Sequence, residues 1–198
     1  MLVLSANADD VVAQAVRCLR DGGVAALPTE TVYGLMTLWR NVAGRERIYE
    51  LKQRPADKRL QMLAASVAMA GQVGVIESPA LRALGRAFWP GPLTVVVEAA
   101  GGETIGLRVP RHGLLLEILT ELGEPLAATS ANLTGQPPAL EAATATAGLA
   151  GEVDVLVDGG TVEVGEASTV VSVVGGELRI LRPGPITEAE LRAALKAE

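Results

Sequence analysis

Short helical and extended patterns alternate along this chain, with no long linker between them. Twenty-two Gly and eleven Pro provide the tight turns that such short elements require. A length of 198 residues suits one well-buried domain, so we expect a single mixed α/β (α+β) domain over residues 1–198. The predicted helices cover 9–20, 42–52, 79–88, 112–122, 141–149 and 187–197, and the predicted strands cover 24–27, 60–65, 93–97, 105–109, 125–129, 153–157, 169–174 and 178–181.

Three local signals define the ends of elements. Pro79 follows Ser78 and occupies the first helical position, where its missing N–H costs nothing. Gly175-Gly176 suits the two-residue turn of a hairpin between the strands that flank it. Thr187 and Glu190 have the spacing of a capping box, which predicts the start of the last helix.

The overall charge excludes some classes of function. A formal net charge of −6 argues against a general nucleic-acid coat, which needs a basic excess to neutralise phosphates. It does not exclude a local basic cleft. No apolar run approaches the roughly 18 residues of a membrane span, and the N-terminus lacks the pattern of a signal peptide. We therefore expect a cytoplasmic protein without membrane contact.

The residue types present also limit the chemistry. One His and one Cys cannot form a His/Cys metal cluster, and we expect no metal ligands among the protein side chains. The sequence has no phosphate-binding G-x-x-x-x-G-K-[ST] loop, no G-x-G-x-x-G fingerprint and no G-x-S-x-G elbow. If the protein is an enzyme, it is expected to work by positioning and electrostatics, without a protein nucleophile.

Lys52 and Arg54 are the first candidate site residues. Pro55 disfavours helical geometry at Arg54, so Lys52 should lie in the last turn of a helix and Arg54 just beyond it. The two cations could then converge on one anion, most naturally a polyphosphate. The alternative is that Lys52 only compensates the dipole at the helix C-terminus.

Ser130 and Asn132 form a second candidate pair. Residues two apart on an extended strand share a face, so a hydroxyl and an amide would project together beyond the strand 125–129. Open α/β sheets often bind ligands at such strand ends. The alternative is an Asx or Ser turn that closes onto Gly135.

Other polar residues follow or interrupt apolar strands. The segment 28–34 carries Thr29, Thr31 and Tyr33 directly after a predicted buried strand. Arg108 lies inside an apolar strand, where its charge requires a partner. Hydroxyls and cations recur at later strand ends in Ser168 and Arg182.

Seven segments of the chain, taken in order, resemble the YrdC/Sua5/TsaC family of L-threonylcarbamoyladenylate synthases. The match spans about residues 22–185 and is specific as a set. The segments are Pro-Thr-Glu-Thr-Val-Tyr-Gly (28–34), Lys-Gln-Arg-Pro (52–55), Phe-Trp-Pro-Gly-Pro-Leu-Thr (88–94), Leu-Arg-Val-Pro-Arg-His (107–112), Thr-Ser-Ala-Asn-Leu-Thr-Gly (129–135), Ser-Thr-Val-Val (168–171) and Leu-Arg-Pro-Gly (181–184).

The resemblance implies a three-layer fold with a twisted mixed β-sheet around a deep basic cavity. It implies condensation of L-threonine, bicarbonate and ATP, with Mg²⁺, into threonylcarbamoyl-AMP and pyrophosphate. The product would pass to a tRNA threonylcarbamoyl transferase complex for t6A modification at position 37 of tRNAs that read ANN codons. Direct nucleic-acid binding by the protein itself is expected to be weak or absent.

The resemblance also assigns roles to residues. The ATP-binding candidates are Lys52, Arg54, Ser130, Asn132 and Arg182, with Lys52 and Arg54 stabilising charge. The candidates for threonine or carbamate binding are Thr31, Arg108, Ser168, Thr29 and Tyr33.

Three residues depart from the family pattern. Met36 stands where the family usually continues Leu-Gly, so the loop after Tyr33 is expected to differ in shape. Leu63 replaces a threonine-contacting His of the longer Sua5-type members, so that contact must be absent or replaced. Ala167 replaces a frequent Glu. The end of the sequence near residue 198 suggests the short, TsaC-like form, without the extra C-terminal domain of Sua5-type proteins.

Two alternative functions remain. An RNA-binding or regulatory module of the same fold is one, although the acidic balance and the lack of interleaved aromatics weigh against it. The other is a carbamoyl-adenylate-forming domain like that of the hydrogenase-maturation carbamoyltransferases, which are much larger chains.

Overall fold

Ten strands form one mixed sheet in the computed structural model, which describes residues 1–197. The sheet contains parallel pairs (β1–β8, β2–β8, β4–β6 and β5–β9) and antiparallel pairs, which confirms the predicted mixed α/β fold with a mixed sheet. In spatial order the strands are β1 (Leu2–Ser5), β8 (Val155–Asp158), β2 (Ala25–Leu27), β3 (Gly34–Leu38), β7 (Leu126–Ser130), β4 (Gln61–Leu63), β6 (Thr104–Arg108), β5 (Leu93–Glu98), β9 (Thr169–Ser172) and β10 (Arg179–Arg182).

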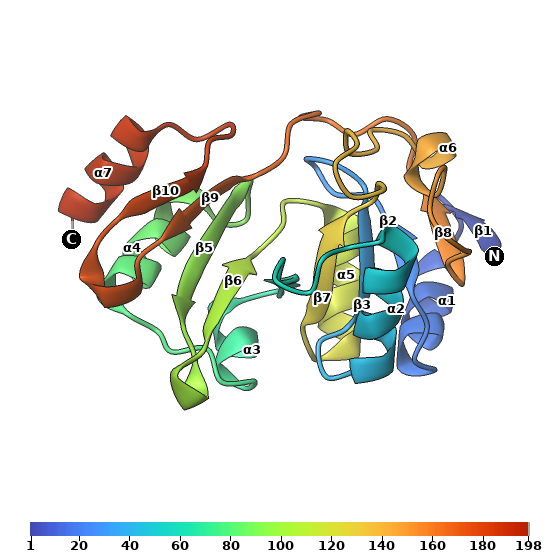
Figure 1. Ribbon diagram of the computed structural model, residues 1–198, viewed down its shortest axis with the longest axis horizontal. Coiled ribbons are helices and arrows are strands. Elements are labelled where there is room, and N and C mark those ends of the chain that lie inside the picture. The colour runs from blue at the N-terminus through green and yellow to red at the C-terminus, as the bar shows by residue number, and fades with distance from the viewer. Residues whose placement is uncertain (198) are drawn as a thin grey trace.

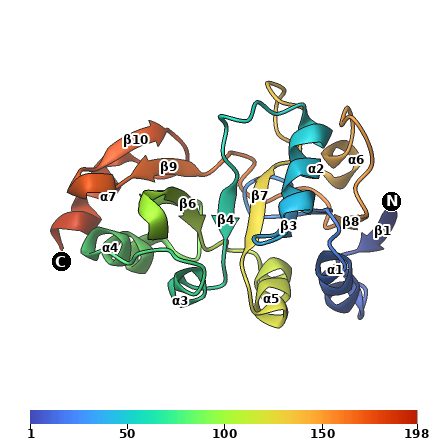
Figure 2. The same ribbon diagram turned by 60° about the horizontal axis from the view of Figure 1, so that its bottom comes forward.

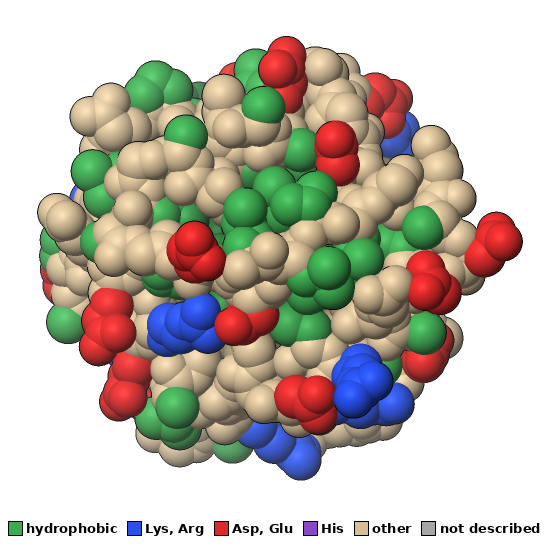
Figure 3. All heavy atoms as spheres, turned by 90° about the vertical axis from the view of Figure 1, so that its right-hand side faces the viewer, with side chains coloured by type: hydrophobic (Ala, Val, Ile, Leu, Met, Phe, Trp, Pro, Cys, Tyr) green, Lys and Arg blue, Asp and Glu red, His purple; other side chains and the backbone are tan. Residues whose placement is uncertain are grey.

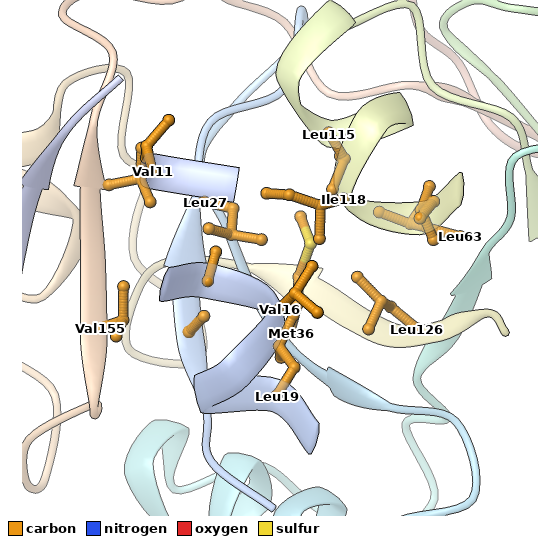
Figure 4. Packing of buried hydrophobic residues seen from close by; sticks show 14 of the residues in the cluster. Val11, Val16, Leu19, Leu27, Met36, Leu63, Leu115, Ile118, Leu126 and Val155 are labelled. Atoms are coloured by element: carbon orange, nitrogen blue, oxygen red, sulfur yellow. The ribbon is translucent and has the colours of Figure 1, made fainter. Parts of the chain in front are cut away.

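Helices cover both faces of the half of the sheet that contains β1, β8, β2, β3 and β7 (Figures 1 and 2). Helices α1 (Val11–Arg20) and α5 (Gly113–Leu122) pack on one face, and α2 (Val42–Lys52) and α6 (Ala142–Ala145) on the other. Side chains from α1, α5 and six strands meet in the first core cluster, part of which is shown in Figure 4. The strands between these layers are therefore buried on both sides, which fits their continuous apolar runs.

The other half of the sheet is covered differently. Helices α4 (Pro79–Phe88) and α7 (Glu188–Lys196) pack with β5, β6 and β9 in a second core cluster, to which the short α3 (Val67–Gly71) contributes Ala70. Successive residues of a strand point to opposite faces. Val95 and Leu107 accordingly enter this core, whereas Thr94 and Gly106 line a cavity. The uncovered face of these strands is thus the floor of the candidate site.

Most predicted elements are confirmed, including α2 at its expected residues. Thr187 caps α7 and Glu190 reaches back, which confirms the capping box. Antiparallel pairing of β9 and β10 around Gly175-Gly176, both with positive φ, confirms the hairpin. The predicted helix 141–149 is shorter in the structure, where α6 covers only Ala142–Ala145. The elements β1, β3 and α3 were not predicted.

The expectation for Met36 was wrong. Met36 lies in β3, where it pairs with Ala128 of β7, and its side chain is fully buried in the first core cluster (Figure 4). The residues after Tyr33 therefore form a regular central strand and not an altered loop.

Within residues 1–197, no helix is both long enough and apolar enough to cross a bilayer. Acidic and basic side chains are interspersed on the face that carries the N-terminal edge of the sheet (Figure 3).

Candidate functional site

A cavity of about 300 Å³ lies over β4, β6, β5 and β9, against the end of β7 and the segment before β3. Six of the predicted site residues line it together: Thr31, Arg54, Arg108, Ser130, Ser168 and Arg182. Four of the lining residues are Arg and none is Asp or Glu, so the wall is basic in an acidic chain. A neighbouring cavity of about 580 Å³ adjoins Asn132.

The end of α2 gives Lys52 and Arg54 different surroundings. Gln53 adopts a left-handed conformation (φ 47°) and turns the chain sharply after Lys52. Arg54 lies at the cavity wall, where its Nε and Nη2 donate to the carbonyls of Lys58 and Arg59. The guanidinium is therefore held in place while it still faces the cavity.

Lys52, by contrast, is 1% exposed. Its ammonium donates to the carbonyl oxygens of Ser130 (2.5 Å) and Asn132 (2.6 Å) and to Asn132 Oδ1 (3.1 Å). These three bonds use all the donors of an ammonium. Burial, and to a smaller extent the charge of Arg54, lowers the pKa of Lys52 from 10.5 to about 8. In this structure Lys52 contacts the Ser130–Asn132 segment directly, and its role in ATP binding remains a prediction.

Ser130 and Asn132 are brought together, but in a turn. Ser130 Oγ donates to Asn132 Oδ1 at 2.5 Å, and Asn132 Nδ2 donates to the carbonyls of Leu133 and Gln136. The strand β7 ends at Ser130. The alternative of a turn after the strand is therefore realised, while Ser130 still lines the main cavity.

Arg182 and Ser168 meet on the opposite wall. Arg182 donates to Ser168 O through Nε (3.1 Å) and Nη2 (2.7 Å), and Nη2 also reaches Ser168 Oγ (3.1 Å). Gly184 permits this approach, because a Cβ there would lie 2.6 Å from Thr169 N and 2.7 Å from Ala167 O. Burial, then the nearby charge of Arg108, lowers the pKa of Arg182. Two guanidiniums in mutual repulsion favour an anion between them.

Arg108 has a partner that the sequence could not identify. Its Nη2 lies 2.8 Å from Glu30 Oε2, and the two side chains are 3% and 1% exposed. Arg108 Nε donates to Gly91 O, and Glu30 Oε1 accepts from the backbone N–H of Arg111. The ion pair thus joins the segment before β3 to the segments on either side of β5 and β6.

The remaining candidates lie deeper. Thr29, Thr31 and Tyr33 line a small cavity of about 20 Å³, which shares several walls with the main one. Thr29 Oγ1 contacts Thr31 Oγ1 at 2.9 Å and donates to Val32 O. The Tyr33 hydroxyl donates to Gly160 O and accepts from Gly159 N–H. The Tyr33 hydroxyl is therefore engaged by the backbone of Gly159 and Gly160.

Leu63 and Met36 form the apolar side of this small cavity, and Ala167 lines the main one. The residues that sequence reasoning missed are Glu30, Gln61, Thr94 and Thr104. Alternation in β5 and β6 marks Thr94 and Thr104 as polar residues on the face opposite the core. That signal could have identified both.

Comparison with known proteins now identifies the family. The Sua5/YciO/YrdC family model, described as "Telomere recombination", matches residues 17–184. The threonylcarbamoyl-AMP synthase of Bacillus subtilis is 38% identical over 205 residues, covering 97% of this chain and 58% of that protein. A putative threonylcarbamoyl-AMP synthase of Mycobacterium tuberculosis is 32% identical over 193 residues, covering 93% of this chain and 88% of that protein.

A solved structure agrees in fold. P. abyssi Sua5 complexed with L-threonine has a TM-score of 0.89 and 30% sequence identity, covering 98% of this chain and 60% of that one. This chain therefore spans less than two thirds of the Bacillus relative (58%) and of this structure (60%). The matched residues 17–184 and these identities show that the chain belongs to the Sua5/YciO/YrdC family.

Proposed function

We propose that this protein condenses L-threonine, bicarbonate and ATP into L-threonylcarbamoyl-AMP, with release of pyrophosphate. The observation that carries the proposal is the cavity wall, where four Arg and several neutral donors converge without an acidic residue. Its size, about 300 Å³, is of the order expected for a small-molecule site. The family relatives named threonylcarbamoyl-AMP synthase support the same reaction.

The chemistry requires no protein nucleophile. The amine of threonine and bicarbonate form a carbamate and water. A carbamate oxygen attacks the α-phosphorus of ATP, the bond from that phosphorus to the bridging oxygen breaks, and pyrophosphate leaves with the electron pair. The carbamate and the triphosphate are both anionic, so the protein must hold two anions together and stabilise charge in the transition state.

The geometry suggests how the residues divide this work. Arg54 and Arg182 face the cavity from opposite walls and would bind the phosphates, with Ser130 and Asn132 on the nucleotide side. Lys52 would hold the Ser130–Asn132 segment in position. Thr31, Arg108 and Ser168, supported by Thr29 and Tyr33, would contact threonine or its carbamate.

Mg²⁺ would arrive with ATP. Residues 1–197 contain no group of three or more His, Cys, Asp or Glu able to hold a metal ion. The cation would therefore be held chiefly by phosphate oxygens, whose charge it would partly neutralise.

The product is a reactive mixed anhydride, which implies a second enzyme that uses it as a substrate. We propose that a tRNA threonylcarbamoyl transferase complex takes it for t6A modification of tRNAs that read ANN codons, in the cytoplasm. Figure 3 shows no concentration of Lys and Arg on the N-terminal face, which fits hand-off of a small molecule better than extensive tRNA binding there.

The test is pyrophosphate release from ATP with Mg²⁺, bicarbonate and L-threonine. We expect release that depends on threonine and on bicarbonate, and Arg54→Ala should reduce it at least tenfold, whereas the exposed Arg40→Ala should not. Release equal to the no-threonine control would contradict the proposal. If carbamoyl phosphate replaced threonine and bicarbonate as the better substrate, the protein would be a carbamoyl-adenylate-forming domain. Tight, salt-sensitive tRNA binding without ATP consumption would favour an RNA-binding module.

A further inference from the structure

Four side chains of the cavity form a chain of hydrogen bonds, here called the Arg182–Gln61 chain. Arg182 Nη2 donates to Ser168 Oγ at 3.1 Å, and Ser168 Oγ lies 2.9 Å from Thr94 Oγ1. Thr94 Oγ1 in turn donates to Gln61 Oε1 at 3.0 Å. Ser168 is 2% exposed and Thr94 is likewise 2% exposed, so these bonds are shielded from bulk water.

The proton positions in this chain follow from counting donors. A hydroxyl has one proton to donate. Because Thr94 gives its proton to Gln61, the bond between the two hydroxyls must use the proton of Ser168. Arg182, which can only donate, stands at the head of the chain. All the bonds therefore run in one direction, and Oε1 of Gln61 is occupied as an acceptor.

The direction of the chain determines what Gln61 offers to a ligand. Its Nε2 carries two N–H donors, and no bond from Nε2 to another part of residues 1–197 is seen. Gln61 lines both the main cavity and the small one beside it. In the small cavity its neighbours Leu63, Met36 and Ala128 form an apolar wall. An uncharged donor thus stands next to a surface that suits a methyl group.

The other substrate groups have stronger partners elsewhere. Phosphates and carboxylates are bound best by guanidiniums, which Arg54 and Arg182 present to the same cavity. An uncharged amide beside apolar carbon suits a hydroxyl that has a methyl group next to it. Among the substrates of the proposed function, on which this inference rests, the ribose of ATP also has hydroxyls, but only threonine carries a hydroxyl and a methyl on one carbon. We propose that Gln61 is a specificity-determining residue that binds the β-hydroxyl of the amino acid, with the γ-methyl against Leu63 and Met36. Thr94 acts through Gln61 as a positioning residue.

The test compares L-threonine with L-2-aminobutyrate, which differs only in lacking the hydroxyl. In the wild type we expect kcat/KM for threonine to exceed that for 2-aminobutyrate at least roughly tenfold, the value of about one neutral hydrogen bond at a shielded site. Gln61→Met keeps length and removes the donor. It should lower kcat/KM for threonine roughly tenfold, mainly through KM, and leave that for 2-aminobutyrate unchanged. Gln72→Met, at an exposed position, is the matched control.

Gln61→Glu distinguishes the hydroxyl from the carboxylate of the substrate. A hydroxyl can donate to the new carboxylate, so threonine should remain preferred over 2-aminobutyrate. If Gln61 instead bound the substrate carboxylate, the new charge would weaken both amino acids equally. Equal losses in Gln61→Met and Gln61→Glu for both substrates would overturn the inference, as would an unchanged threonine preference in Gln61→Met.

The positioning role of Thr94 has its own readout. Thr94→Val should reduce the threonine preference, and adding it to Gln61→Met should reduce the preference no further, because both act on one interaction. Full additivity would contradict that role. Failure of the proposed function is distinguishable, since it would appear as a wild type without threonine-dependent pyrophosphate release, whatever residue occupies position 61.

Discussion

The buried pair Glu30–Arg108 gives the sharpest test of how the site is held together. Replacing Glu30 by Leu strands the Arg108 guanidinium at 3% exposure, with Gly91 O as its remaining partner. Breaking a buried ion pair by removing one partner costs about 3–5 kcal/mol. The same replacement also leaves the backbone N–H of Arg111 without its acceptor, a further cost of about 1–3 kcal/mol.

The double variant Glu30→Leu with Arg108→Met separates these two costs. It removes the stranded charge and leaves only the Arg111 N–H unpaired, so it should recover the larger part of the lost stability. We expect Glu30→Leu alone to lower the free energy of unfolding by about 4 kcal/mol or more, and the double variant by about 1–3 kcal/mol.

Urea denaturation followed by circular dichroism, at a temperature where the single variant still folds, measures both values. A single variant that loses less than about 1 kcal/mol would refute the assignment of a buried, uncompensated charge. A double variant that loses as much as the single one would show that the unpaired Arg108 guanidinium adds no cost of its own.

Three further predictions concern other contacts. Gly184→Ala should displace the Ser168 backbone and lower the free energy of unfolding by about 1–3 kcal/mol. Calorimetry should also show weaker ATP binding. An unchanged unfolding free energy and an unchanged ATP affinity would contradict the close contact between Gly184 and the backbone of residues 167–169. The pKa of Lys52 is about 8 in the folded chain and 10.5 ordinarily, so between these values the unfolded chain binds more protons. The unfolding free energy relative to Lys52→Met should therefore rise between pH 8 and 10.5, and a flat or falling difference would exclude the lowered pKa. Thr187→Ala should lower the free energy of unfolding by about 1 kcal/mol, because it removes the N-cap of α7. An unchanged free energy of unfolding would show that this cap contributes little to stability.

Local patterns in the sequence identified most helices, because their caps and apolar faces lie within a few neighbouring residues. The strand β3 was missed for a physical reason. It lies between β2 and β7 in the sheet and is buried on both faces, so its sequence does not alternate between polar and apolar residues. The polar segment before it also resembles a loop. The end of α2 was located correctly through Pro55, but the sharp turn is made by Gln53, a residue without any sequence signal for positive φ.

The residues of the candidate site likewise include some that local sequence patterns reveal and some that they do not. Residues such as Arg54 and Arg182 could be recognised because cations follow the ends of predicted elements. The partner of Arg108 could not, because Glu30 is brought to it only by the sheet topology. Two of the three acceptors of the Lys52 ammonium were equally hidden, since they are backbone carbonyls at the end of β7 and in the turn after it. Long-range contacts of this kind depend on register, which the sequence leaves open.

The most direct measurement supplies the wild-type protein with ¹³C-bicarbonate, L-threonine, ATP and Mg²⁺, and identifies the nucleotide product by mass spectrometry. We predict an adenylate that carries both threonine and the labelled carbon, formed in the same amount as pyrophosphate and strongly reduced in Arg54→Ala. Pyrophosphate without a labelled adenylate, or no labelled adenylate from the wild type at all, would contradict the central claim that this cavity joins a threonine carbamate to the α-phosphate of ATP.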